Sequence, residues 1–137
     1  MILRVRHAMN TAPQVVDCET PVSDTAYRMI QAGTDTVIVT EGKKIKGTVD
    51  LRNILRYTYT EGFRPRQTPI GEIANSDIIL ARPNTSLEDA LTIMTELKQD
   101  TLPVVDGELV GSINIHDLLK AQPKTKPHQS IALAQTT

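Results

Sequence analysis

The chain has 137 residues, of which 39% are apolar and 23% charged, a composition typical of one soluble globular domain. Fifteen basic and sixteen acidic residues leave a formal charge of −1, which argues against broad nucleic-acid binding because that requires a basic face. Aromatic residues make up only 3%, so we expect no stacking platform for single strands. No apolar run approaches the roughly 20 residues of a membrane-spanning helix, and we expect no membrane association.

Residues 1–7 lack the apolar core of a signal peptide, and Cys18 is the only cysteine, which precludes an intrachain disulfide. Both features are typical of a cytoplasmic protein. Cys18 lies between Asp17 and Glu19, and acidic neighbours raise the pKa of a thiol. We therefore interpret Cys18 as a structural residue rather than a nucleophile.

The chain contains one internal repeat, which relates residues 10–55 to residues 75–119. Each half begins with a short apolar segment, at 14–16 and at 78–81, which we interpret as a strand. An amphipathic stretch follows, in which apolar side chains recur every three or four residues and predict a helix. The repeated apolar positions are Val22, Ala26, Met29 and Ile30 in the first half and Leu87, Leu91, Met94 and Leu97 in the second.

Two short β-branched runs follow each predicted helix, and a tight turn joins them. In the second half this turn contains Asp106-Gly107, a strong hairpin signal between apolar runs. Each half then closes with a glycine, a strand end, a polar residue and a second helix, at residues 47–55 and 111–119. Asp50 and Asn114 are equivalent there, and both residue types are good N-caps. For the first helices we expect N-caps at Thr20 or Ser23 and at Thr85 or Ser86.

The sequence therefore predicts an α/β (α+β) protein made of two tandem βαββα repeats. We place the first repeat at residues 1–65, the second at 66–122 and a disordered tail at 123–137. One such unit has a single apolar sheet face and too little core to fold alone. We therefore expect the repeats to pack sheet to sheet, with pseudo-two-fold symmetry, as one folding unit. The dyad would create paired clefts where the second helices begin.

The second half resembles a CBS domain. Residues 101–111, followed by 112–119, resemble the closing part of a CBS repeat, and residues 77–90 resemble its opening part. The first half is a weaker match, because Thr36-Val37 stands where the family usually has Leu-Pro. The resemblance covers about residues 5–121 and implies a CBS-domain pair, or Bateman module. It implies a free-standing cytoplasmic regulatory protein that is not an enzyme and that reaches its protein partner in trans.

The resemblance also implies a ligand, because such pairs commonly bind AMP, ADP, ATP or S-adenosylmethionine between their repeats and tend to form homodimers. The family's ligand signature is a glycine, two strand residues, a Ser or Thr, two residues and an Asp. A hydroxyl or amide at a helix start can donate to phosphate oxygens, and a carboxylate one turn later can accept both ribose hydroxyls. Gly111, Asn114 and Asp117 follow the signature, with Asn in the hydroxyl position, whereas Asp50 and Asn53 depart from it.

By analogy with the family we expect one good adenosine site per pair. Its residues would be Ser112, Asn114 and Asp117 from the second repeat and Gln14, Val15, Thr34, Thr36 and Arg52 from the first. Arg52 stands where related modules place a basic residue that reaches phosphate across the dyad. A weaker second site would contain Asp50, Asn53, Ile79 and, across the dyad, His116. Asp35 disfavours ATP, because strong polyphosphate binders often have a basic residue there, so AMP or S-adenosylmethionine fits better.

Other interpretations stay open. Asp50 and Asn114 can serve simply as N-caps, and Asp117 as a favourable partner of the helix dipole, which would fit a structural dimerisation adaptor with empty clefts. An enzyme is disfavoured because the sequence has no nucleophile–base pair, no Walker-type phosphate loop and no metal-ligand spacing. We expect no required cofactor and no metal site. A nucleic-acid role would need one basic patch formed by Arg4, Arg6, Arg52, Arg56, Arg64 and Arg66.

Overall fold

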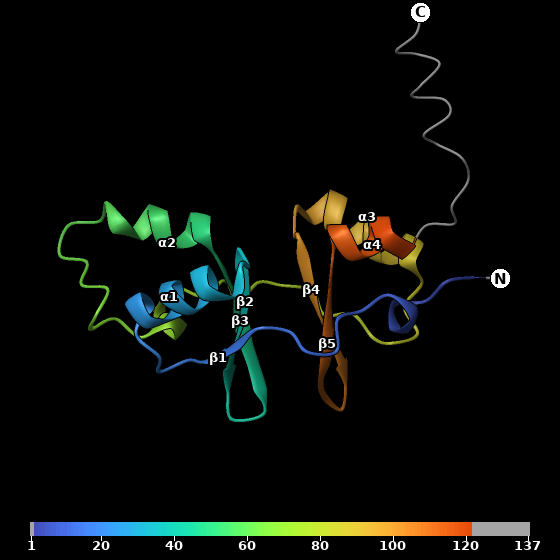
Figure 1. Cartoon of the computed structure of the whole chain (residues 1–137), viewed down its shortest axis with the longest axis horizontal. Helices are drawn as coiled ribbons and strands as arrows, with labels where there is room; N and C mark the ends of the chain where they lie inside the picture. Colours follow the sequence, from blue (N-terminus) through green and yellow to red (C-terminus); the bar gives the residue numbers. More distant parts are fainter. Residues whose placement is uncertain (1, 122–137) are drawn as a thin grey trace, which may run out of the picture.

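The computed structural model describes residues 2–121, which form two similar halves (Figure 1). In the first half, β1 (Val15–Asp17) pairs in parallel with β2 (Thr36–Glu41), which pairs antiparallel with β3 (Lys44–Asp50). Helices α1 (Val22–Ala32) and α2 (Leu51–Thr58) complete this half. The second half contains α3 (Leu87–Leu97), the antiparallel hairpin β4 (Thr101–Asp106) and β5 (Glu108–Asn114), and α4 (Ile115–Ala121).

The two sheets stand side by side in the middle of the molecule, with α1 and α2 beyond one sheet and α3 and α4 beyond the other (Figure 1). The hairpins are copies in detail, because the register shifts at Val39/Thr40 in one and at the equivalent Val104/Val105 in the other. The predicted α/β architecture of two repeats packed sheet to sheet is therefore confirmed. No helix among residues 2–121 is long and apolar enough to cross a membrane.

Each half has its own hydrophobic core, and a segment from outside the repeat completes it. Val5, in a short 3₁₀ helix (Val5–His7), is fully buried in the core of the second half, where its N–H donates to the Thr85 carbonyl at 2.7 Å. Ile70 is fully buried in the core of the first half, where its N–H donates to the Thr20 carbonyl at 2.7 Å. Our boundary after residue 65 divides the repeats along the sequence, but these two segments cross to the opposite half. We call residues 5–10 and 65–75 the crossing segments.

The crossing segments also explain why one N-cap prediction is wrong. The N-cap of α1 is Pro21 rather than Thr20 or Ser23, and no side chain caps this helix. The Val22 and Ser23 N–H groups donate instead to carbonyls of Thr68 and Pro65, both at 2.9 Å, so the crossing segment satisfies them. At α3 the prediction is confirmed, because the Ser86 hydroxyl accepts from the Asp89 N–H at 3.0 Å.

The strand predicted at residues 78–81 is absent except for one parallel bridge between Ala81 and Val104. In the first half, the Ile38 N–H donates to the Gln14 carbonyl at 3.0 Å and begins the ladder between β1 and β2. The residue equivalent to Ile38 is Pro103, which has no N–H to donate. The sheet of the second half therefore loses its parallel strand where the sequence places proline in the neighbouring strand.

Gly47 and Gly111 allow the crossing segments to reach the sheets. Asn75 pairs with Thr48 through hydrogen bonds of 2.8 and 3.0 Å, and Asn10 pairs with Ser112 through bonds of 2.8 and 2.9 Å. A Cβ atom on Gly111 would stand 2.6 Å from the Asn10 carbonyl oxygen, and one on Gly47 would collide with the carbonyl of Asn75. Each glycine is thus required because a backbone from the other repeat passes directly over it.

We predict that Gly111→Ala lowers the free energy of unfolding by about 1–3 kcal/mol, because the added methyl forces the passing backbone to shift. Gly42→Ala is the matched control, since Gly42 has a φ of +61° but open space around it, and we expect a loss of about 0.5–1 kcal/mol there. Urea denaturation measures both. Equal losses in the two variants would contradict a tight crossing at Gly111.

The two first helices end in the same backbone conformation with different residues. Gly33 follows α1 with a φ of +67°, and Lys98 follows α3 with a φ of +54°, the one positive φ of a non-glycine residue among those described. A left-handed conformation is strained for lysine and not for glycine. We predict that Lys98→Gly stabilises the protein by about 0.5–1 kcal/mol, whereas Gly33→Ala destabilises it by about 1 kcal/mol, in urea denaturation. A loss of stability in Lys98→Gly would show that the Lys98 side chain contributes more than its backbone costs.

Candidate functional site

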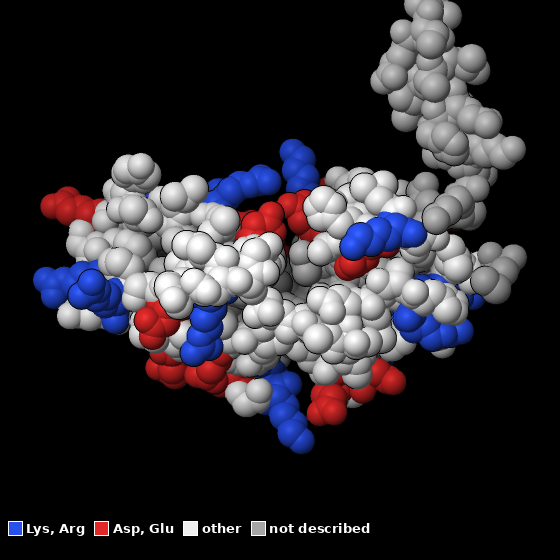
Figure 2. Space-filling view, viewed as in Figure 1, with Lys and Arg blue, Asp and Glu red and all other residues white. Residues whose placement is uncertain are grey.

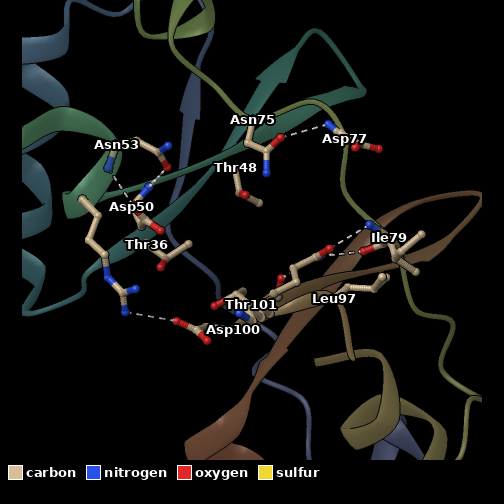
Figure 3. A pocket seen from close by; sticks show the side chains of 13 residues that line it. Thr36, Thr48, Asp50, Asn53, Asn75, Asp77, Ile79, Leu97, Asp100 and Thr101 are labelled. Carbon is tan, nitrogen blue, oxygen red and sulfur yellow. Dashed lines mark hydrogen bonds and ion pairs between the residues drawn. The ribbon is translucent and has the colours of Figure 1, made fainter. Parts of the chain in front are cut away.

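Among the clefts that open between the halves, two are related to each other by the repeat. The Ser112 cleft has a volume of 190 Å³ and the Gln99 cleft one of 390 Å³. The Ser112 cleft is lined by Asn10, Ala12, Pro13, Gln14, Ala32, Thr34, Thr36, Ile38, Thr101, Ser112 and Asn114. The Gln99 cleft, shown in Figure 3, is lined by Thr36, Thr48, Asp50, Arg52, Asn53, Asn75, Asp77, Ile79, Leu97, Lys98, Gln99, Asp100 and Thr101.

A reciprocal pair of hydrogen bonds opens the second helix of each repeat. The Asp50 carboxylate accepts from the Asn53 N–H at 2.8 Å, and the Asp50 N–H donates to Asn53 Oδ1 at 3.1 Å. In the second repeat, Asn114 Oδ1 accepts from the Asp117 N–H at 3.0 Å and the Asn114 N–H donates to Asp117 Oδ2 at 2.9 Å. Both are capping boxes, built from one Asp and one Asn in opposite order. The prediction that Asp50 and Asn114 are N-caps is confirmed.

The structure brings together most of the residues expected at the first site. Gln14, Thr34, Thr36, Ser112 and Asn114 all line the Ser112 cleft. Val15 and Asp117 are not part of its lining; Asp117 lies behind Asn114, to which its Oδ2 is bonded. A carboxylate has further acceptor capacity, so Asp117 Oδ1 can still accept a hydrogen bond.

The two basic residues that we expected to act across the dyad lie elsewhere. Arg52 lines the Gln99 cleft together with Asp50, Asn53 and Ile79, and its guanidinium lies 3.9 Å from Asp100 (Figure 3). His116, expected beside Asp50 and Asn53, instead shares a shallow groove with Asn114 and Asp35. Arg52 and His116 each follow the N-cap of their helix by two residues. Each side chain therefore lies near the start of its own helix and does not reach the cleft on the other side of the dyad.

Ser112 is the most informative residue of the Ser112 cleft. The residue is only 7% exposed, and its hydroxyl makes no hydrogen bond with any other residue in 2–121. No described buried side chain lacks both solvent contact and a partner, so this hydroxyl faces the cleft. Its only partner is then solvent in the cleft, and a ligand atom within hydrogen-bonding distance can take the place of that solvent. Sequence analysis named Ser112 only through its place in the repeat.

The two clefts differ in charge. No charged side chain lines the Ser112 cleft. Three carboxylates, from Asp50, Asp77 and Asp100, line the Gln99 cleft together with Arg52 and Lys98. A phosphate would therefore meet more negative than positive charge in the Gln99 cleft and no charged partner in the lining of the Ser112 cleft. Over the face shown in Figure 2, lysine and arginine side chains lie in separate places among acidic ones, with no single basic patch.

Cys18 has the surroundings of a structural residue. Its side chain is buried, with the residue 5% exposed, and its thiol donates to a Glu41 carboxylate oxygen at 3.7 Å. Burial, followed by the charges of Asp17, Glu41 and Glu19, raises the pKa of the Cys18 thiol. The reactive thiolate is therefore disfavoured at neutral pH. Among residues 2–121, no group of three or more His, Cys, Asp or Glu side chains is placed to hold a metal ion.

Comparison with known proteins identifies the family. The family model of the CBS domain matches the chain twice, at residues 5–59 and 70–124. This chain is a CBS-domain protein. The CBS domain-containing protein YhcV of Bacillus subtilis is 32% identical over 115 residues, which are 83% of this chain and 81% of YhcV. The CBS-domain pair suggested by the sequence is therefore confirmed, and each matched range contains the two helices and the hairpin of one half.

Other similar proteins are longer than the region that they share with this chain. An uncharacterized protein of Methanocaldococcus jannaschii is 27% identical over 116 residues, which are 82% of this chain and 62% of that protein. A solved CBS-domain protein from Thermoplasma acidophilum superposes with a TM-score of 0.80 at 21% identity, covering 100% of this chain and 78% of that one. These likenesses support the fold and leave the ligand to be argued from the clefts.

We predict that Asn114→Ala lowers the free energy of unfolding by about 1 kcal/mol, because the Asp117 N–H loses its capping oxygen. Asn114→Ser should stay within a few tenths of a kcal/mol of the unchanged protein, since serine caps equally well. Urea denaturation of both variants decides this. The same loss in the serine variant would mean that Asn114 contributes through contacts other than the cap.

Proposed function

We propose that this CBS pair is a regulatory module that binds an adenosine-type ligand in the Ser112 cleft and signals to a partner protein in trans. The observation that carries the proposal is the largely buried, unpartnered Ser112 hydroxyl in a cleft walled by both repeats. Around it, Gln14, Thr34 and Asn114 supply further polar groups, and the second Asp117 oxygen can accept a ribose hydroxyl. A small number of polar groups that face one cavity is typical of a small-molecule site.

The charges of the cleft favour a ligand without a polyphosphate. With a volume of 190 Å³, the Ser112 cleft is smaller than the roughly 300–1,000 Å³ of most ligand pockets, and its lining carries no basic residue for a polyphosphate. We therefore propose adenosine, AMP or S-adenosylmethionine rather than ADP or ATP. The proposed role is regulatory and not catalytic, and a cytoplasmic location fits a single buried cysteine.

We further propose that the module works as a homodimer. Helices of both repeats carry large apolar side chains that are more than a third exposed, and such surfaces are typical of interfaces. They are Tyr27, Ile30, Leu51, Leu55 and Tyr57 in the first half and Leu91, Leu97, Ile115 and Leu119 in the second. A dimerisation adaptor with empty clefts is the alternative function, and the capping roles of Asp50 and Asn114 favour it, since these residues are explained without a ligand.

A thermal-shift screen with adenosine, AMP, ADP, ATP and S-adenosylmethionine tests the proposal. At 100 times its dissociation constant, a ligand adds about 2.7 kcal/mol to the stability of the folded state. We expect a shift with adenosine, AMP or S-adenosylmethionine that Ser112→Ala abolishes. Thr48→Val is the matched control, because it removes the equivalent hydroxyl from the Gln99 cleft.

Three outcomes are distinguishable in this screen. Loss of the shift in Ser112→Ala alone supports the Ser112 cleft as the site. Loss in Thr48→Val alone would move the ligand to the Gln99 cleft. A screen without any shift would overturn ligand sensing and leave the dimerisation adaptor as the better function.

A further inference from the structure

The Gln99 cleft contains a backbone edge that the sheet leaves open. In a parallel ladder, Ile79 would donate to the Thr101 carbonyl and accept from the N–H of residue 103. Residue 103 is proline, so the Ile79 carbonyl has no donor in the neighbouring strand. The first repeat has no such gap, because Ile38 stands in this place and its N–H donates to the Gln14 carbonyl at 3.0 Å.

The Gln99 side chain fills this gap with three hydrogen bonds. Its Oε1 accepts from the Ile79 N–H at 2.9 Å, and its Nε2 donates to the Ile79 carbonyl at 2.9 Å and to the Thr101 carbonyl at 3.0 Å. Two of these bonds end at Ile79, where Figure 3 draws them as dashed lines. The carboxamide thus lies between the extended segment at Ile79 and the start of β4.

The equivalent residue of the first repeat makes only one of these three contacts. It is Thr34, whose hydroxyl donates to the carbonyl of Thr36 at 3.0 Å and does not bond to Gln14. The repeat therefore provides an internal comparison: one cleft has a side chain paired with its backbone edge, and the other does not. Gln99 is not needed to form a cleft between the repeats, because the Ser112 cleft exists without such a residue.

The pattern offered by the carboxamide defines what could replace it. An oxygen that accepts from the Ile79 N–H and an adjacent nitrogen that donates to the Ile79 carbonyl form one planar edge. An aminopurine such as adenine presents an acceptor ring nitrogen beside an exocyclic amine, which is the same order of groups. Asp50, Asp77 and Asp100 in the lining disfavour a phosphorylated ligand and leave an uncharged nucleoside as the better fit.

We propose that Gln99 is a displaceable latch that occupies the Ile79 edge and keeps the Gln99 cleft from binding an uncharged aminopurine nucleoside. A ligand must break the three hydrogen bonds of Gln99 before it can make its own. Removal of the latch therefore increases the affinity of this cleft without any change in the other residues that line it. The latch concerns the Gln99 cleft alone and holds whether or not the Ser112 cleft binds a ligand.

The test is an NMR titration of the full chain with adenosine, in which the backbone amides of Ile79 and Ser112 report on the two clefts separately. We expect adenosine to bind at Ile79 at least ten times more tightly in Gln99→Ala than in the unchanged protein. Purine riboside, which lacks the exocyclic amine, should gain much less. Hydrogen exchange at the Ile79 N–H should also become at least ten times faster without ligand in this variant, whereas exchange at Val39, in the core, should not change.

Gln99→Met is the second variant, because methionine keeps the length of the side chain and cannot make the three hydrogen bonds. It should show the faster exchange at Ile79 and an intermediate gain for adenosine, and it answers the question if Gln99→Ala does not fold. Unchanged adenosine affinity at Ile79 in both variants would overturn the latch, as would equal gains for adenosine and purine riboside. Failure of the proposed function is read at Ser112 and leaves these outcomes unaffected.

Discussion

The structure depends on one steric constraint, the passage of a backbone from each repeat over a glycine in the sheet of the other. At Gly47 and Gly111 no side chain separates the crossing segment from the strand, so the segment can pair with the next residue, Thr48 or Ser112. In both segments the residues that precede this contact complete a core: Val5 in the second half, and Ile70 and Ile73 in the first. Neither core is closed by its own repeat alone, which makes the pair one folding unit.

The same constraint builds the clefts. Because the crossing segments pass between the sheets, they and the residues that follow them become cleft walls: Asn10 and Gln14 in one cleft and Asn75, Asp77 and Ile79 in the other. The two clefts occupy equivalent places in the repeats. Their chemistry differs because each cleft combines one wall from the first half with one from the second, and the equivalent residues are not identical. A single proline, Pro103, extends this difference to the backbone, because it removes the ladder that the first repeat keeps at Ile38.

Local features of the molecule could be predicted from the sequence, and contacts between distant segments could not. Helices around Met29 and Met94, the hairpins and the caps at Asp50 and Asn114 follow from periodicity, turn residues and capping chemistry within a few residues. The cap of α1 could not be predicted, because its N–H groups bond to carbonyls more than 40 positions away, at Thr68 and Pro65.

The candidate site divides in the same way. The resemblance to the CBS family grouped Gln14, Thr34, Thr36, Ser112 and Asn114 at one site, and all five line one cleft. It did not reveal on which side Arg52 and His116 lie, since that depends on where a flexible side chain leaves a helical turn. Nor did it reveal Gln99, whose importance arises from a missing N–H in another strand. The combination of proline at 103 and glutamine at 99 was the only sequence signal for this role. It can be interpreted only when the pairing of the strands is known.

A regulatory module requires a ligand that distinguishes two arrangements of the molecule. Here each half keeps a separate hydrophobic core, so the relation between the halves can change with little cost to either core. Both clefts take their walls from both halves, and a ligand in either would therefore favour the arrangement in which the two walls are correctly spaced.

The binding free energy of such a ligand is limited by the hydrogen bonds that it must replace. In the Ser112 cleft the hydroxyl of Ser112 is unpaired before binding, whereas at Ile79 the protein already pairs the backbone edge with its own amide. The Gln99 cleft is larger but harder to occupy, because the protein already makes the hydrogen bonds of its backbone edge. The two clefts therefore differ in how many of their hydrogen-bonding groups are left for a ligand.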